Sequence, residues 1–230
     1  PRTMPVSPKG YRGEVLATYH DTLIFPYHVG GTGFAYTLLK LDINGTLAFD
    51  TVHKFNMHWP KEIKHASDRI YYFGYTGQSS HLVDVFCINM TNRTVRTVVA
   101  SLVRPQNDYH NNMISLGGYM YFIMHTPQHG NELYRDNGAT LEQLTDLRVG
   151  SESGVYGGHN VLYAYKGKIF FSGYDSLDRV ILYQYDPSTK SVSSVNNPWT
   201  QTSYYPSHFT EYNGKLFFSW KSSRTCGLNS

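Results

Sequence analysis

The sequence lacks three features that would each point to a particular class of protein. It has no run of lysines and arginines, and its 20 basic and 17 acidic residues give a formal charge of only +3, which argues against nucleic acid as a partner. No apolar segment approaches the length of a membrane span. No stretch keeps its apolar residues at helical spacing, so we expect almost no helix.

Aromatic residues, by contrast, are abundant. The chain of 230 residues contains 20 tyrosines and 12 phenylalanines, and 40% of it is hydrophobic. A chain of this length and composition can bury a full core. Packing of aromatic rings between neighbouring sheets accounts for most of the aromatic excess. Composition therefore bounds the class of protein without naming a function.

A repeat organises the whole chain. Five times, a turn is followed by a short apolar strand: HDTLIF (20–25), SDRIYYFG (67–74), GGYMYFIM (117–124), KGKIFFSG (166–173) and NGKLFFSW (213–220). The turn residues of these segments, which are Asp21, Asp68, Gly118, Gly167 and Gly214, lie 47, 50, 49 and 47 residues apart. This period matches one four-stranded blade of a β-propeller.

Each repeat offers four strands, which we name a to d. The apolar strand above is strand b, and we place strand a before it at 14–19, 62–66, 112–116, 160–165 and 208–212. Strands c and d follow strand b, and tight turns join them at Asn44-Gly45, at 136–138 and at 186–190. Asn-Gly and Asp-Pro supply the backbone angles that short hairpins require.

We therefore predict an all-β fold, a single domain over residues 1–230 that forms a five-bladed β-propeller of four-stranded antiparallel blades. The blades cover approximately 11–55, 56–104, 105–154, 155–200 and 201–230 together with 1–10. Because the fifth repeat stops short of strand d, we expect residues 3–7 to pair with 223–229, which closes the ring and covers a sheet edge. The alternative is that a further blade lies beyond residue 230.

The third repeat resembles a known family. Its segment GNELYRDNGATLEQLTDLRVGSES (130–153) is similar to the Gly-x-Glu-Leu-Trp-x-x-Asp-Gly-Thr-type propeller repeats of large secreted bacterial and animal proteins. The positions that match or vary this pattern are Gly130, Glu132, Leu133, Tyr134, Asp136, Asn137, Gly138, Asp146, Leu147, Gly150 and Ser151. YDPSTK (185–190) has kelch-like features. The resemblance implies an extracellular scaffold, and it supports the fold and location rather than any chemistry.

Three sequons for N-linked glycosylation also favour a secreted or extracellular protein. They begin at Asn44, Asn89 and Asn92, and all fall on or beside turns between strands c and d, where a glycan would not disturb a strand ladder. The alternative is that asparagine is simply a turn residue and threonine a strand residue.

The two cysteines are expected to stay unbridged. Cys87 and Cys226 lie in the second and fifth repeats, which are not neighbours in a five-membered ring. A disulfide requires Cα atoms within about 7 Å, so no internal bridge is predicted.

Histidines recur at one position of the repeat. His58, His110, His159 and His208 precede successive turn residues by 10, 8, 8 and 6 residues, which places them where strand d leads into strand a. In a propeller these d-to-a loops share the top face with the b-to-c loops. Aromatic residues accompany the histidines, and the predicted ligand-binding residues are His58, Trp59, Tyr109, His110, Tyr156, His159, Tyr204, Tyr205 and His208.

Three interpretations of this cluster stay open. The histidines can be structural residues that cap strand a. They can line a polar pocket for a sugar, whose C–H faces stack on aromatic rings while its hydroxyls take polar partners. They can also bind a divalent metal through His110, His159 and His208, because neutral imidazole is a good ligand for zinc, iron or manganese.

Signals of catalysis are weak. Glycosidases on propellers need two or three carboxylates around the channel, and the candidates are Glu14, Glu62 and Glu211, all near strand a. Pairing with lysine and arginine between blades explains these residues equally well. We find no nucleophile elbow or phosphate loop. The sequence therefore does not establish an enzyme.

Our preferred interpretation is a secreted recognition module that binds a glycan or a glycoprotein through the top face. One alternative is a metal-assisted polysaccharide lyase or hydrolase, with the three histidines above as ligands or acid/base groups and Glu62 or Glu211 as the carboxylate. The other is a purely structural extracellular scaffold. A divalent metal is the only cofactor considered. We expect no nucleic acid among the partners, and we expect no segment that spans a membrane.

Overall fold

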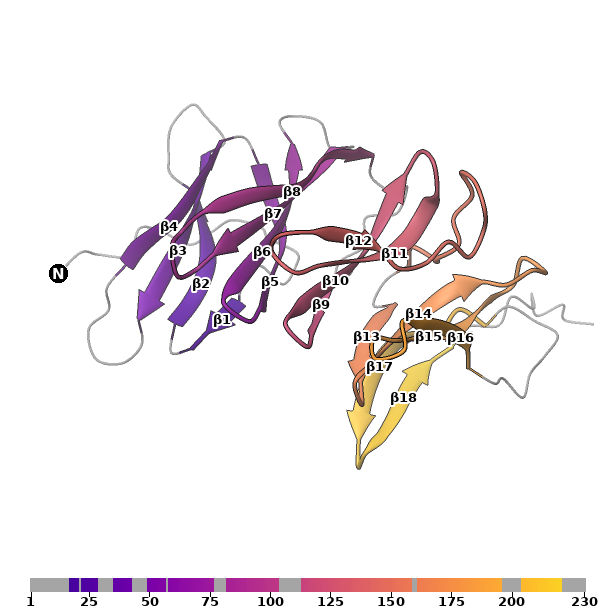
Figure 1. Ribbon diagram of the computed structural model, residues 1–230. Coiled ribbons are helices and arrows are strands. Elements are labelled where there is room, and N and C mark those ends of the chain that lie inside the picture. The colour runs from indigo at the N-terminus through magenta and orange to yellow at the C-terminus, as the bar shows by residue number, and fades with distance from the viewer. Residues whose placement is uncertain are drawn as a thin grey trace, which may run out of the picture. The chain divides into compact units, whose positions relative to one another are not determined.

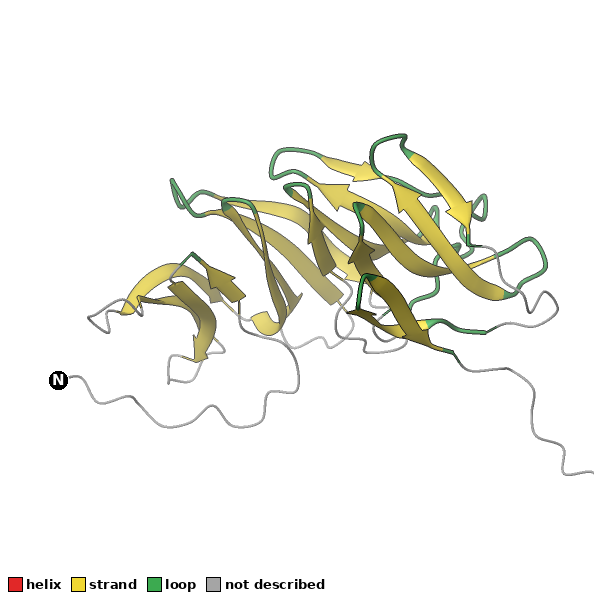
Figure 2. Ribbon diagram, turned by 90° about the horizontal axis from the view of Figure 1, so that it is seen from below, coloured by secondary structure: helices red, strands yellow, loops and turns green. Residues whose placement is uncertain are grey.

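The chain is described here from a computed structural model (Figure 1). The structure describes residues 17–20, 22–28, 35–42, 49–56, 58–76, 82–103, 113–158, 161–195 and 204–220. Every regular element in these ranges is a β-strand, and Figure 2 shows no helix among them. Within these ranges, no helix with the length and apolar character of a membrane span was found. The prediction of an all-β chain is confirmed for the described part.

The strands form five antiparallel sheets, and within each sheet the strands are ordered as they are in the sequence. The first two sheets contain β1 (Ala17–Tyr19), β2 (Thr22–His28), β3 (Ala35–Asp42) and β4 (Phe49–Asn56), and then β5 (His58–Ala66), β6 (Arg69–Thr76), β7 (Leu82–Asn89) and β8 (Val95–Val103). The next two contain β9 (Met113–Leu116), β10 (Tyr119–Thr126), β11 (Gly130–Asp136) and β12 (Leu141–Gln143), and then β13 (Leu162–Tyr165), β14 (Lys168–Tyr174), β15 (Val180–Asp186) and β16 (Ser191–Ser194). The fifth contains β17 (Ser207–Tyr212) and β18 (Lys215–Ser219).

The chain divides into two compact units, residues 1–101 and residues 102–230. The first unit holds the sheets β1–β4 and β5–β8, and the second holds the sheets β9–β12, β13–β16 and β17–β18.

In every sheet, a two-residue turn joins the first two strands. The strand pairs close at Tyr19 and Thr22, at Ala66 and Arg69, at Leu116 and Tyr119, at Tyr165 and Lys168, and at Tyr212 and Lys215. In the last three turns both central residues have positive φ, for example 47° at Lys166 and 74° at Gly167. Turns of this kind match the right-handed twist of the paired strands. The repeat found in the sequence is therefore a repeat of one hairpin.

Each unit has a core between two of its sheets. In the first unit, Ala17 and Ile24 pack with Ile63 and Tyr72, so the sheet β1–β4 faces the sheet β5–β8. In the second unit, the core includes Tyr121, Ile123 and Leu133 from one sheet and Leu162, Ile169, Phe171 and Tyr185 from the next. Part of the aromatic excess of the sequence, including Tyr72, Tyr121, Phe171 and Tyr185, thus packs between sheets.

The prediction of a five-bladed ring closed by its terminal strands was wrong. Four sheets have four strands, but the described part of the fifth has only β17 and β18, and the sheets do not close into a ring. Residues 3–7 and 223–229, which were predicted to pair, lie outside the described residues. The period of the turns identifies repeat units, which are local, whereas closure depends on one long-range pairing that no local pattern specifies.

The segment that resembles a known repeat contributes a buried glutamate, Glu132, to a hydrogen-bond network in the second unit. The carboxylate of Glu132, which is 0% exposed, accepts hydrogen bonds from Thr145 Oγ1 at 2.5 Å and from the Gly154 backbone N–H at 3.0 Å. A Cβ at Gly154 would stand 2.2 Å from Glu132 Oε1, so only glycine fits there. The glutamate of the motif therefore fixes the loop between β12 and β13 against β11.

Candidate ligand-binding surface

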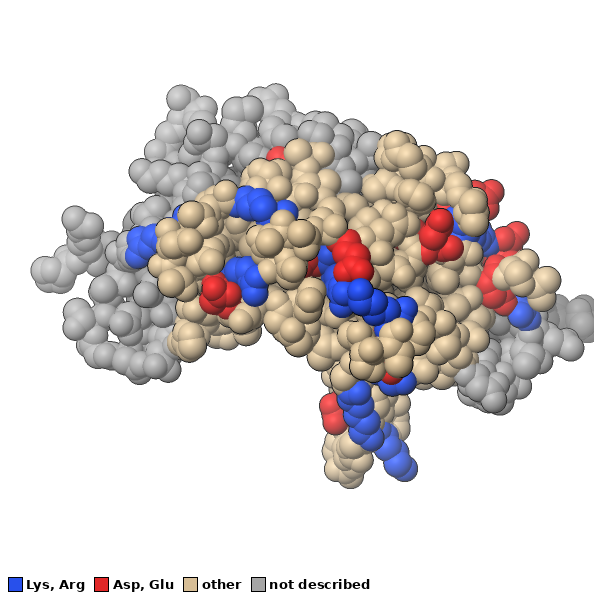
Figure 3. All heavy atoms as spheres, in the orientation of Figure 1, with Lys and Arg blue, Asp and Glu red and all other residues tan. Residues whose placement is uncertain are grey.

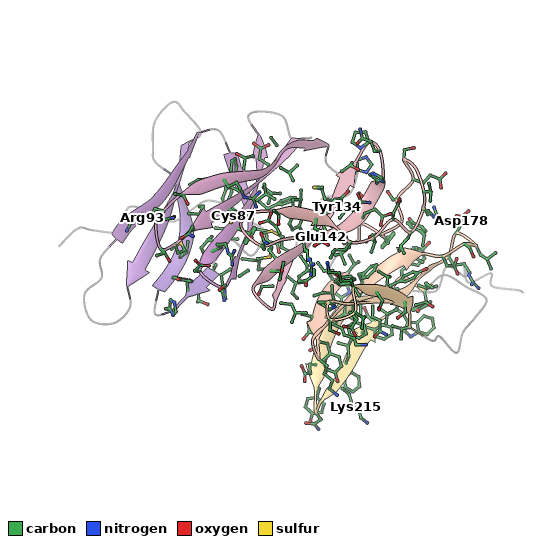
Figure 4. The ribbon with its side chains drawn as sticks, viewed as in Figure 1. Cys87, Arg93, Tyr134, Glu142, Asp178 and Lys215 are labelled. Atoms are coloured by element: carbon green, nitrogen blue, oxygen red, sulfur yellow. The ribbon has the colours of Figure 1, made fainter. Side chains whose placement is uncertain are left out.

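Two loops of the second unit meet at one end of its sheets. One joins β12 to β13 and the other joins β14 to β15. Arg148 of the first loop forms an ion pair with Asp178 of the second. Figure 4 labels Asp178 at this end, away from Lys215 at the tip of the β17–β18 hairpin. A d-to-a loop and a b-to-c loop therefore do lie together in this unit.

Three tyrosines from separate segments gather beside this ion pair. Tyr156 lies between the other two, with its ring centroid 6.1 Å from that of Tyr174 and 5.3 Å from that of Tyr205, both in edge-to-face geometry. All three side chains are half-buried. Tyr174 ends β14, while Tyr156 and Tyr205 lie in the segments that lead into β13 and β17. We call these three residues and Arg148 the tyrosine surface.

Ser172 of β14 holds two of these tyrosines in place. Its backbone carbonyl accepts a hydrogen bond from the Tyr156 N–H at 2.9 Å, and its hydroxyl donates to the carbonyl of Pro206, next to Tyr205, at 2.5 Å. Ser172 is 0% exposed, so both hydrogen bonds are protected from water. The two segments are thereby fixed on either side of the end of β14.

Arg148 covers the third tyrosine. Its guanidinium carbon lies 4.4 Å from the centre of the Tyr174 ring, a distance at which the cation attracts the face of the ring. Glu152 Oε2 lies 3.5 Å from Arg148 Nη1, and Asp178 pairs with Nη2. The arginine is therefore neutralised by two carboxylates and is not a free anion receptor.

Burial raises the pKa of the Tyr174 hydroxyl, and the nearby Tyr205 and Asp178 add to the rise while Arg148 opposes it. The hydroxyl therefore stays protonated at neutral pH and can donate a hydrogen bond.

Asp175 forms hydrogen bonds across the loop between β14 and β15. Its carboxylate accepts hydrogen bonds from the backbone N–H groups of Leu177 and Arg179, each at 2.9 Å, and from Arg179 Nε at 2.8 Å. Burial would raise the pKa of Asp175, but these hydrogen bonds outweigh it and hold the pKa below its ordinary value. Leu177, at the tip of this loop, is 67% exposed, and Val149 in the other loop is 91% exposed.

Of the predicted ligand-binding residues, Tyr156 and Tyr205 lie in the tyrosine surface. Tyr204 is 3% exposed, and its hydroxyl accepts a hydrogen bond from the Leu182 N–H at 2.7 Å, so it has a structural role. His208 is exposed on β17, where its Nδ1 lies 3.0 Å from Ser207 Oγ and 3.1 Å from Ser219 Oγ.

The other predicted site residues cannot be placed beside them. Tyr109, His110 and His159 lie outside the described residues. His58 and Trp59 begin β5 in the first unit, where only their backbone is described.

The described residues bring no metal site together. No group of three or more histidine, cysteine, aspartate or glutamate side chains in this part of the chain could hold a metal ion. His129 Nδ1 instead lies 3.7 Å from Oδ2 of Asp146, which lies in the loop between β12 and β13.

The candidate carboxylates belong to different parts of the chain, with Glu62 in the first unit and Glu211 in the second. Glu62 is 4% exposed on β5, Glu211 is exposed on β17, and Glu14 lies outside the described residues. Cys87 is buried at 2% exposure, and Cys226 is also outside the described residues.

Two of the three sequons lie on a described turn of the first unit, and Asn44 lies outside the described residues. Asn92 is exposed, and its Oδ1 accepts hydrogen bonds from the Thr94 N–H at 3.0 Å and from Thr94 Oγ1 at 2.7 Å. Asn89 is half-buried at the end of β7, and its Oδ1 accepts from the backbone N–H groups of Thr91 and Asn92.

The sequence analysis missed Tyr174, Arg148 and Asp178. Tyr174 directly follows the predicted strand b of the fourth repeat, and Arg148 lies within the segment that resembles a known repeat. Only tertiary structure brings the two residues together. One signal was available: strands b and c of the fourth repeat are joined by YDSLDR (174–179), a loop that contains tyrosine, acids and arginine.

No protein-family model matches the chain, and no curated protein sequence matches it significantly. Solved structures do resemble it. A prolyl endopeptidase matches 89% of the chain with a TM-score of 0.59 and 15% sequence identity. A puromycin-hydrolyzing peptidase of Mycobacterium tuberculosis matches 91% of it with a TM-score of 0.50 and 12% identity, and dipeptidyl peptidase 4 of Porphyromonas gingivalis matches 86% with a TM-score of 0.52 and 10% identity.

The chain spans only 30%, 34% and 26% of these three proteins. At such low identity the likeness concerns the fold alone. It supports a β-propeller-like scaffold built from repeated four-stranded sheets.

Proposed function

We propose that this chain is a secreted recognition domain that binds a glycan, free or carried by a glycoprotein, through the tyrosine surface. The observation that supports the proposal most is the gathering of Tyr156, Tyr174 and Tyr205, half-buried and from three separate segments, next to Arg148 and Asp178. Rings that only packed a core would be buried, as Tyr121 and Tyr185 are at 1% exposure.

The chemistry of the surface suits a sugar. Saccharides present C–H faces that stack on aromatic rings and hydroxyls that need fixed donors and acceptors. The Tyr174 hydroxyl and Arg148 supply donors, while Asp178 and Glu152 supply acceptors. Buried hydrogen bonds to Ser172 hold the backbone at Tyr156 and at Pro206, next to Tyr205, so little ordering of these two segments is required when a ligand binds.

Secretion is part of the same proposal. The exposed sequon at Asn92 supports it, since its asparagine and threonine lie on a turn that a glycan could occupy without breaking strand pairing. Asn89 and Asn44 remain proposed glycosylation sites. Treatment of protein from a eukaryotic secretory host with an N-glycosidase should lower its mass, and Asn92→Gln should remove part of that shift.

A glycan array tests binding by the tyrosine surface. The unmodified protein should bind a defined set of oligosaccharides, and Tyr205→Ala should weaken that binding at least tenfold, because truncation of a central aromatic contact commonly costs about 2 kcal/mol or more. Tyr212→Ala is the matched control, since Tyr212 is 67% exposed on β17 in the same unit. Absence of any bound oligosaccharide, or equal loss in both variants, would leave a purely structural scaffold as the better interpretation.

A further inference from the structure

On the basis of the proposed function, we infer that the tyrosine surface selects uncharged saccharides and disfavours sulfated or carboxylated ones. A ligand that approaches this surface meets charged side chains, and these either repel it or form hydrogen bonds with it.

Six charged side chains belong to the two loops at this surface. Asp146 is one of them, and its Oδ2 lies 3.7 Å from Nδ1 of His129. The other five are Arg148 and Arg179, and Asp175, Asp178 and Glu152, which leave one net negative charge at neutral pH. Arg179 is already paired with Asp175, whose Oδ2 lies 2.6 Å from its Nη2. Arg148 is paired with both Glu152 and Asp178. Neither arginine is therefore left to bind an anionic group of a ligand.

The acidic groups are also the outermost ones. The side chains of Asp178 and Glu152 are 86% and 75% exposed, whereas those of Arg148 and Arg179 are 20% and 28% exposed. Figure 3 shows acidic and basic side chains adjoining near the end of the molecule where Figure 4 labels Asp178. A ligand that approaches the rings thus meets carboxylates before it meets guanidinium groups.

Carboxylates bind sugar hydroxyls but repel sulfates, because the two groups differ in charge and in their capacity to donate a hydrogen bond. An ionised carboxylate only accepts hydrogen bonds, so a hydroxyl can donate to it. A sulfate or uronate group has no proton to donate at neutral pH and is repelled by the like charge. Repulsion between two like unit charges about 6 Å apart in water lowers the binding affinity about threefold, and salt screens this repulsion.

The experiment compares matched pairs of immobilised oligosaccharides that differ only in one sulfate group. The protein should bind the uncharged member of each recognised pair about threefold or more tightly at low salt, and the preference should shrink in 0.5 M NaCl. Asp178→Asn should reduce the preference about threefold, with thermal melting to show that the variant is folded. Glu211→Gln is the control, because Glu211 is an exposed acid on β17 outside the surface.

Equal or tighter binding of the sulfated members would overturn this inference while leaving the proposed function intact. Loss of the preference in Glu211→Gln as well would also overturn it, because the discrimination would then come from overall charge. If no member of any pair binds, the proposed function and this inference both fail.

Discussion

At the scale of single residues, the hairpin turns depend on backbone conformations that side chains resist. Gly167 has φ of 74°, although a Cβ there would meet no atom within 4 Å. Gly167→Ala should therefore cost about 1 kcal/mol through backbone strain alone, seen as a lower midpoint in urea unfolding. Asn213→Gly, at φ of 49° in the equivalent turn, should not lower the midpoint. A similar loss in both variants would argue against strain as the cause.

The buried Glu132 is expected to be the most sensitive polar residue of the second unit. Glu132→Ala removes the acceptor for Thr145 Oγ1 and for the Gly154 N–H, and leaves both buried without it. The loss should be about 2–4 kcal/mol in the free energy of unfolding, measured by chemical denaturation. The exposed Glu211→Ala serves as the comparison and should change stability little. Two variants of equal stability would contradict the role assigned to Glu132.

Asp186 gives the protein part of its acid sensitivity. Hydrogen bonds from the Ser188 side chain and backbone, followed by Lys168, lower the pKa of Asp186 to about 2. Because the folded pKa lies below the unfolded value of about 3.9, the stabilisation is complete above that value and is lost as the pH falls toward 2. Thermal melts of Asp186→Asn should therefore differ from those of the parent above pH 4 and converge with them near pH 2. A constant difference across this range would exclude the ionised carboxylate as the source.

At the scale of elements, nearly the same sequence occupies two different environments. β14 begins KIFFS and β18 reads KLFFS, yet Phe171 is fully buried between sheets while its counterpart Phe218 is only half-buried. Phe171→Ala should cost about 3–5 kcal/mol, and Phe218→Ala clearly less, in denaturant unfolding. Equal losses would mean that Phe218 is covered as fully as Phe171.

The strands were predictable because their signals are local. β9 and β17 each begin within one residue of the ranges predicted for strand a, 112–116 and 208–212, and they end at the predicted residues. A turn residue followed by alternating apolar residues specifies a hairpin and its register without reference to the rest of the chain. The same reasoning placed Gly167 and Gly214 in hairpin turns, where the structure has them.

At the scale of the whole molecule, the sequence was less informative. Ring closure was predicted wrongly, since it depends on a pairing between distant segments that local patterns do not encode. Tyr156 and Tyr205, which lie in the tyrosine surface, were predicted as ligand-binding residues only because they accompany histidines in the sequence. What gathers them is Ser172, a serine in a strand whose carbonyl and hydroxyl contact two remote segments, and no spacing in the sequence reveals such a contact.

The central claim is that Tyr156, Tyr174 and Tyr205 together form a saccharide-binding surface. The most direct test is NMR of the protein with isotope-labelled tyrosine rings, assigned by single Tyr→Phe variants and titrated with an uncharged oligosaccharide that it binds. The account predicts saturable shifts of these three rings, with no shift of the exposed Tyr212. Binding that shifts other tyrosines and leaves these three unchanged would contradict it.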